Sequence, residues 1–142
     1  MNKILLSLVL CLGMLFLVAC SGGDDASSSD SITGVEWQWQ SVTNQTTNDT
    51  TTVPNPENYT ITFNEDGTFE GQADCNSIAG SWSQDNGFSI TVGPSTLAFC
   101  GEASLDQVYV ALLGSVAAGG PDGSGGLALE TAGGAQRLLF ES

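Results

Sequence analysis

Short segments in which apolar and polar residues alternate constrain the fold of this chain more than any other feature. Val35, Trp37 and Trp39 alternate with polar residues, and residues 59–63 repeat the pattern with two aromatic side chains. Successive side chains of a β-strand point to opposite faces, so this period of two predicts strands with one buried face. Further strands are expected at residues 88–92, 127–129 and 138–140.

Turn residues separate these predicted strands. Residues 64–67, Asn-Glu-Asp-Gly, connect the strand at 59–63 to Thr68 and Phe69, and Gly67 is placed to adopt a positive φ. Asp85-Asn86-Gly87 and Gly133-Gly134 mark two more turns. Residues 44–58 are rich in Thr and Asn and contain two prolines, which predicts a long surface loop.

One segment has helical periodicity instead. Its apolar residues follow a spacing of three and four, which places them on one face of a helix. They are Leu105, Val108, Tyr109, Leu112, Leu113 and Val116. Ser104 followed by Gln107 predicts a capping box at the start, and Gly119 to Pro121 are expected to end the helix. Antiparallel strands with one amphipathic helix predict an α+β domain.

The N-terminus predicts export and lipid attachment. Lys3 precedes an apolar run from Ile4 to Val18, too short to span a membrane, and Cys20 follows directly after Leu-Val-Ala. This arrangement resembles a bacterial lipoprotein signal, which is cleaved before a cysteine that carries diacylglycerol, often with palmitate or a similar chain on the new amine. An ordinary secretory signal with an incidental cysteine is the alternative. We expect a signal peptide at 1–19, a flexible tether at 20–34 and a domain at 35–142.

The charge of the mature chain excludes several partners. Cleavage removes Lys3 and leaves Arg137 as the only basic side chain against 16 acidic ones, a side-chain charge of 1 − 16 = −15. Such a surface repels nucleic acid and anionic lipid headgroups, so membrane attachment is expected through the lipid on Cys20. The acidity favours a soluble monomer, with an acidic recognition patch as the alternative.

Two cysteines remain for pairing in the mature domain, Cys75 and Cys100. An even pair in an exported domain favours a disulfide, which would contribute about 3–4 kcal/mol in the chain-entropy model. Two buried free thiols are the alternative.

The residue types argue against an enzyme. The chain has no histidine, which excludes Ser-His-Asp and Cys-His systems, and two cysteines cannot form a four-cysteine zinc site. Among the acids only Asp74, beside Cys75, is a catalytic candidate. The turn at 64–67 resembles part of a calcium-binding loop, but Ala73 stands where the final Glu should be. We expect no metal, no cofactor and no catalytic residue.

From Trp37 onward the chain resembles the META domain, also called the HslJ-like family. The blocks that carry the resemblance are 37–40, 59–71, 74–76 with Gly80 and Trp82, 95–100, the helix and the closing strands. It implies a curved antiparallel sheet, partly barrel-like, with a helix packed against it. Asp74 replaces the usual Gly, and Phe99 stands where the family has Ala before the cysteine. The motif residues are interpreted as structural: Trp37, Gly67, Asn76, Gly80 and Thr96.

Two functions fit this resemblance. The first is a non-catalytic, lipid-anchored envelope protein that binds a protein partner or serves in envelope stress. It would reside at the periplasmic face of the outer membrane in a two-membrane bacterium, and otherwise on the outer face of the cell membrane. The alternative is a carrier that holds a small apolar ligand inside the barrel. Whether side chains fill the interior distinguishes the two.

The lipid anchor yields the first prediction. The mature protein is expected to partition into the detergent phase with lipid on Cys20, and Cys20→Ala is expected to release it or leave it unprocessed. Intact-mass measurement of the purified protein checks this. Processing that is insensitive to globomycin, an inhibitor of the lipoprotein signal peptidase, would contradict it.

Overall fold

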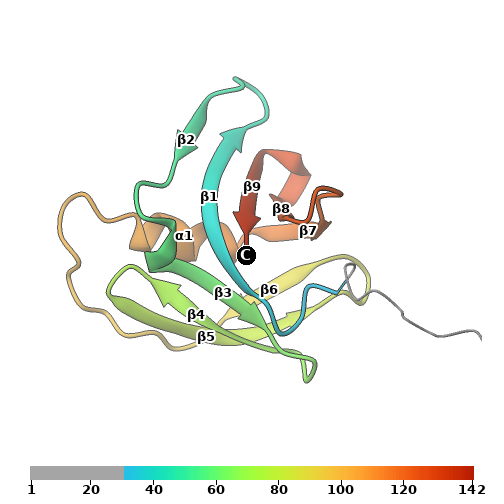
Figure 1. The fold of residues 1–142 in the computed structure, drawn as a ribbon, viewed down its shortest axis with the longest axis horizontal. Coiled ribbons are helices and arrows are strands. Elements are labelled where there is room, and N and C mark those ends of the chain that lie inside the picture. Colours follow the sequence, from blue (N-terminus) through green and yellow to red (C-terminus); the bar gives the residue numbers. More distant parts are fainter. Residues whose placement is uncertain (1–30) are drawn as a thin grey trace, which may run out of the picture.

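The computed structural model describes residues 31–142, so Cys20, the signal segment and most of the expected tether lie outside the described residues (Figure 1). The strands are β1 Glu36–Asn44, β2 Thr50–Thr52, β3 Tyr59–Phe63, β4 Thr68–Ala73, β5 Asn76–Ser83, β6 Ser89–Val92, β7 Val116–Pro121, β8 Leu127–Thr131 and β9 Gln136–Glu141. The helix is α1 Asp106–Leu113, and two 3-10 turns are η2 Pro56–Asn58 and η3 Ala132–Gly134.

All the strands form one antiparallel sheet in the order β6-β5-β4-β3-β1-β9-β8-β7, with β2 added beside β1. The sheet curls until its edge strands β6 and β7 lie next to each other, which gives a nearly closed barrel (Figure 1). The expected α+β fold with a curved, barrel-like sheet and one helix is confirmed.

Strand β1 bends in the middle because it pairs with different partners along its length. Residues 36–38 pair with β3, whereas residues 41–43 pair with β2. On its other side β1 pairs with β9, and the register shifts between Trp39 and Ser41, the mark of a β-bulge. The Gln40 carbonyl at this bulge accepts the Val53 N–H at 2.9 Å. The bulge lets one strand bend around the barrel while the residues on both sides of it stay paired with β9.

Aromatic side chains fill the barrel interior. Trp39 and Tyr109 are fully buried and stack with ring centroids 5.0 Å apart, so the helix packs directly on the central strand. Trp37, Phe63, Phe69 and Phe88 are buried in the same core. Tyr59 and Phe140 also lie against the Tyr109 ring. The interior is therefore occupied by side chains where a carrier would hold its ligand.

The helix is shorter than the periodicity predicts. It ends at Leu113, and residues 116–121 form strand β7, paired with β8. Gly114 and Ser115 are weak helix formers, and the edge of β8 offers hydrogen bonds that a longer helix would leave unmade. Val108, expected on the buried face, is half-exposed. The Ser104 hydroxyl accepts the Asp106 N–H at 3.2 Å, and Gln107 does not complete the expected capping box.

Two other boundaries differ from the expectations. The predicted loop at 44–58 contains β2 and η2, and Val53 is buried, because the half of β1 beyond β3 needs a pairing partner. The packed domain also begins before residue 35. Ile32 is buried and its carbonyl accepts the Trp37 indole N–H at 2.9 Å. Within residues 31–142 no helix is long and apolar enough to cross a membrane.

Tyr109 gives the second prediction. Its hydroxyl is buried without a hydrogen-bond partner among the described residues, and burial raises the pKa of this hydroxyl well above its usual value. Tyr109→Phe keeps the ring that stacks on Trp39 and removes the unpaired group. We expect the free energy of unfolding to rise by about 1 kcal/mol, measured by urea denaturation.

Tyr59→Phe is the matched control. The Tyr59 hydroxyl accepts the Leu105 N–H at 2.9 Å and lies 3.3 Å from an Asp74 oxygen, so its loss is expected to lower stability. Equal changes in the two variants would contradict the assignment of Tyr109 as the unsatisfied group.

Candidate interaction site around the disulfide

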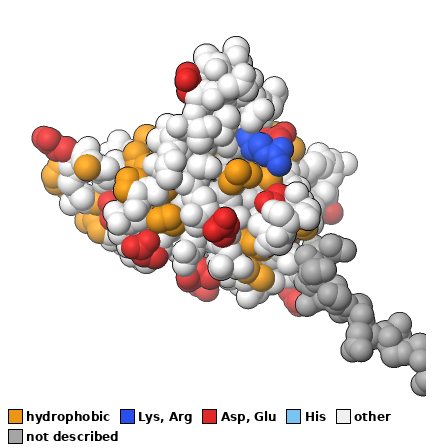
Figure 2. All heavy atoms as spheres, turned by 45° about the horizontal axis from the view of Figure 1, so that its top comes forward, with side chains coloured by type: hydrophobic (Ala, Val, Ile, Leu, Met, Phe, Trp, Pro, Cys, Tyr) orange, Lys and Arg blue, Asp and Glu red, His pale blue; other side chains and the backbone are white. Residues whose placement is uncertain are grey.

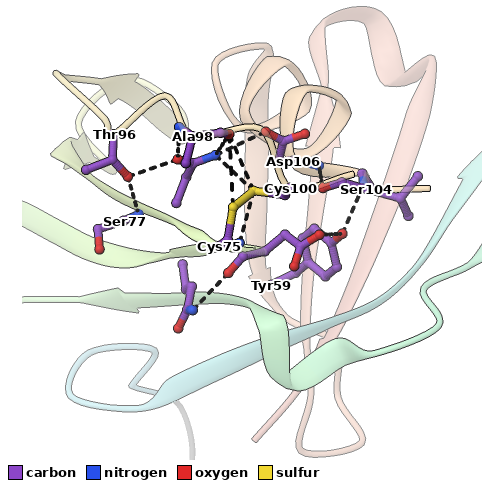
Figure 3. Close-up of a disulfide and its surroundings, with 12 residues drawn as sticks. Tyr59, Cys75, Ser77, Thr96, Ala98, Cys100, Ser104 and Asp106 are labelled. Carbon is purple, nitrogen blue, oxygen red and sulfur yellow. Dashed lines mark hydrogen bonds between the residues drawn. A yellow bond between two sulfur atoms is a disulfide. The ribbon is translucent and has the colours of Figure 1, made fainter. Parts of the chain in front are cut away.

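A disulfide joins the β4–β5 turn to the segment between β6 and α1. Cys75 and Cys100 are bonded, with their Cα atoms 5.6 Å apart (Figure 3). The predicted pairing is confirmed, and the alternative of two free thiols is wrong. The bond fixes Cys100 within a segment, residues 93–105, that belongs to no helix or strand.

The Asn76 side chain holds the same segment through its amide. Its Oδ1 accepts the Ala98 N–H at 2.8 Å and the Thr96 hydroxyl at 3.0 Å. Its Nδ2 donates to the Ala98 carbonyl at 3.0 Å and lies 3.2 Å from both Cys100 Sγ and Asp106 Oδ2. Asn76 is itself buried, so its polar atoms need these partners. One side chain thereby fixes the position of residues 96–100.

Thr96 completes this attachment. Its hydroxyl accepts the Ser77 N–H at 2.9 Å while donating to Asn76, and its own N–H donates to the Ser77 carbonyl at 3.2 Å (Figure 3). These bonds extend the pairing along β5 to Ser77, beyond the part of the strand that pairs with β6. The motif residues Asn76 and Thr96, which are 20 positions apart in sequence, therefore act as one structural unit.

The hairpin turn before Asn76 explains one departure from the family pattern. Asp74, where the family has Gly, has φ +56°, a left-handed conformation that Gly adopts freely and Asp tolerates. Its carboxylate lies 3.3 Å from the Tyr59 hydroxyl, which accepts the Leu105 N–H at the start of α1. The substitution keeps the turn and links it to the helix.

The other motif residues also have packing roles. Gly67 has φ +82° in the β3–β4 turn, as predicted, and its carbonyl accepts the Trp82 N–H. A side chain at Gly80 would overlap the Thr91 carbonyl and the Phe69 ring. Trp37 is buried at the start of β1. None of these three residues lies in the 93–105 segment.

Three apolar side chains stand out on the surface of the same region. Leu97 is 92% exposed, Phe99 83% and Val108 50%, and they are the exposed large hydrophobic residues among the described ones. Figure 2 shows apolar side chains gathered at this end of the molecule, with acidic ones beside them. We call Leu97, Phe99 and Val108 the apolar tip.

Two hollows flank the apolar tip. One, of about 240 Å³, runs between α1 and the β4–β5 hairpin, where Ile78, Leu97 and Val110 line it. The other, of about 300 Å³, is bordered by Phe99, Glu102 and Val108. Asp106 borders both. The apolar tip therefore lies beside two surface hollows, and carboxylates border both of them.

Elsewhere in the domain, two carboxyl groups with a shifted pKa accept hydrogen bonds within turns. Hydrogen bonds from the Thr68 hydroxyl and N–H lower the pKa of Asp66, and those from the Ser124 N–H and hydroxyl lower the pKa of Asp122. Arg137 pairs with Glu130 at 3.0 Å on the surface. Residues 31–142 contain no cluster of three or more metal-ligating side chains. Asp74, the one acidic residue considered as a catalytic candidate, lies in the hairpin turn, where its carboxylate is 3.3 Å from the Tyr59 hydroxyl.

The whole described domain matches one known family. The family model of the META domain covers residues 30–142. The chain belongs to the META domain family. No curated protein matches it.

Two solved structures share the META fold of this chain. A DUF4847 family protein from Bacteroides vulgatus ATCC 8482 has 17% identity and a TM-score of 0.57, over 78% of this chain and 93% of the other. A protein from Burkholderia xenovorans, solved by NMR, has 17% identity and a TM-score of 0.62, over 81% and 86%. At this identity the likeness concerns the fold alone.

Sequence reasoning missed the apolar tip. Leu97 and Phe99 belong to a block of the family resemblance, residues 95–100, that indicates a structural role, and the helical periodicity predicts Val108 on the buried helix face. The available signal was Phe99 itself, because it departs from the family pattern at a position before the cysteine. Its exposure depends on how Asn76 and the disulfide hold the backbone, which the sequence does not display.

The attachment by Asn76 yields the third prediction. Asn76→Ala removes the bonds to Thr96 and Ala98, and we expect the free energy of unfolding to fall by about 2–3 kcal/mol. Asn64→Ala, in an exposed turn where the side chain bonds only Thr68, is the control and should change stability by about 0.5 kcal/mol or less. Urea denaturation of the two variants checks both expectations, because a shift of the midpoint at an unchanged slope of unfolding free energy against urea concentration measures a change in stability. Equal effects would show that Asn76 has no special role.

Proposed function

We propose that this META domain protein is a non-catalytic, lipid-anchored envelope protein that binds a partner protein through its apolar tip. The observation that carries the proposal is the exposure of Leu97 and Phe99 on a segment that is fixed in place. Exposed apolar side chains on a rigid support lose little conformational entropy on binding, which favours recognition. Apolar patches of this kind mark interaction sites on soluble domains.

The charges around the tip suggest the chemistry of the partner. Glu102 and Asp106 lie at the margin of the hollows, and Arg137, the only basic residue in the described part of the chain, is on β9. A partner with an apolar contact surface and Lys or Arg at its rim complements this arrangement. The same charges oppose self-association, so we propose a monomer.

The position of the tip is compatible with attachment at the N-terminus. In Figure 1 the described chain begins on the right, whereas the segment before α1 lies on the left. A tether leading from Ser31 to lipid on Cys20 therefore leaves the tip free to contact a partner. We propose the periplasmic face of the outer membrane in a two-membrane bacterium, or otherwise the outer face of the cell membrane.

The carrier function has less support. Trp39, Tyr109, Phe63 and Phe69 occupy the barrel interior, and the more apolar of the two hollows, at about 240 Å³, lies at the surface. Typical ligand sites occupy about 300–1,000 Å³ and enclose most of the ligand. The second hollow, of about 300 Å³, is at the lower end of this range and is open to solvent, so both hollows suit side chains of a partner better than a whole ligand.

Carbodiimide crosslinking in native envelopes gives the fourth prediction. This reagent joins carboxylates to amines, and we expect a recurrent protein linked through Glu102 or Asp106. The double substitution Leu97→Ser with Phe99→Ser is expected to reduce this crosslink at least about tenfold, the factor that corresponds to about 1.4 kcal/mol. Crosslinked peptides are identified by mass spectrometry.

Ala117→Ser on β7 is the matched control, because it also replaces an exposed apolar side chain with Ser. It should leave the crosslink unchanged. A crosslink that survives the double substitution would overturn the role of the tip. A copurifying lipid or metabolite without a protein partner would favour the carrier.

A further inference from the structure

The two sulfur atoms of the disulfide have different surroundings. Cys75, in the hairpin turn, is exposed, whereas Cys100, in the segment that leads to α1, is half-buried. An external thiol therefore has freer access to Cys75. Access is one of the factors that decide which sulfur of a disulfide is attacked.

Hydrogen-bond donors favour the same direction of attack. The Cys75 N–H lies 3.3 Å from Cys100 Sγ, and Asn76 Nδ2 lies 3.2 Å from the same sulfur (Figure 3). Among the described residues no N–H group donates to Cys75 Sγ. Donors of this kind stabilise a thiolate more than a neutral sulfur, so Cys100 is the better leaving group.

Two acceptors near Cys100 act in the opposite sense. The Ala98 carbonyl oxygen is 3.6 Å from Cys100 Sγ, and Asp106 Oδ2 lies 3.2 Å from the Asn76 amide nitrogen that also faces the sulfur. Asn76 thus supplies two amide hydrogens to three acceptors. Its Nδ2 separates the Asp106 carboxylate from the developing charge on Cys100.

We propose that the Cys75–Cys100 disulfide is a directional thiol-exchange site, attacked at Cys75 by a thiol such as glutathione or a protein dithiol. The attacking thiolate forms a bond to Cys75 Sγ while the bond to Cys100 breaks. The electron pair goes to Cys100 Sγ, which leaves as a thiolate and accepts the N–H groups of Cys75 and Asn76. A second thiol attacks the mixed disulfide, which releases reduced Cys75 and oxidises the two external thiols to a disulfide.

The reaction is expected to be reversible. After cleavage, Asn76 and Thr96 still hold Ala98, so Cys100 stays close to Cys75 and can displace the external thiol again. The inference concerns the reactivity of the bond and does not depend on a partner at the apolar tip.

The test locates the first mixed disulfide on the full chain purified in detergent. The oxidised protein is treated with limiting glutathione and quenched with excess N-ethylmaleimide, which blocks the released thiol. Cleavage at Asp85 separates the two cysteines for mass spectrometry. We expect glutathione on Cys75 and maleimide on Cys100, with this species at least about tenfold above the reverse one.

Two charge variants test the role of the surroundings. Asn76→Asp replaces the donor with a carboxylate and is expected to slow reduction and reduce the bias toward Cys75. Asp106→Asn removes the opposing charge and is expected to speed reduction. Asn64→Asp makes the same charge change at the opposite end of β4 and should have no effect.

The wild-type mapping decides the proposal even if Asn76→Asp does not fold. Glutathione on Cys100, an even distribution, or a disulfide that does not react would each overturn it. Slower reduction of Asp106→Asn than of the wild type would likewise contradict the assigned leaving group.

Discussion

The rest of the structure depends on strand β1, because a single strand joins the two parts of the sheet. It pairs with β3 and β2 on one side and with β9 on the other, and its bulge after Trp39 lets the sheet turn. Trp39 points into the barrel at this bend and stacks on Tyr109 of the helix. The curvature of β1 therefore sets both the size of the interior and the place where α1 closes it. Side chains fill the space that results.

The segment between β6 and α1 illustrates how a non-repetitive stretch becomes rigid. It has few backbone partners of its own, so side chains from the β4–β5 hairpin and from β3 supply them. Asn76 forms hydrogen bonds with Thr96 and Ala98, and the disulfide fixes Cys100. The Tyr59 hydroxyl accepts the Leu105 N–H. These attachments are polar and covalent, and they free Leu97 and Phe99 from any role in the core. The apolar tip exists because other residues hold its backbone.

The chemistry near the disulfide follows from the same arrangement. Asn76 Nδ2 donates to the Ala98 carbonyl, which positions the segment, and also lies 3.2 Å from Cys100 Sγ. The attachment of the segment and the proposed difference in sulfur reactivity therefore share one side chain. Asp106 at the helix start contributes a carboxylate to this group and to the margin of the hollows. Arg137, the one basic residue among those described, lies on β9, so the charges beside the apolar tip are negative.

Most of the architecture was predictable from residue order alone. Alternation identified β1, β3, β6, β8 and β9, the Asn-Glu-Asp-Gly turn fixed one hairpin, and an even number of cysteines indicated the disulfide. These features are local or compositional, so the sequence itself determined them. Strand β7 was not predictable, because residues 116–121 become a strand only when the edge of β8 is present. The partners of Asn76, the exposure of Phe99 and the unequal environments of Cys75 and Cys100 were decided by tertiary structure, since each arises from residues about 20 or more positions apart.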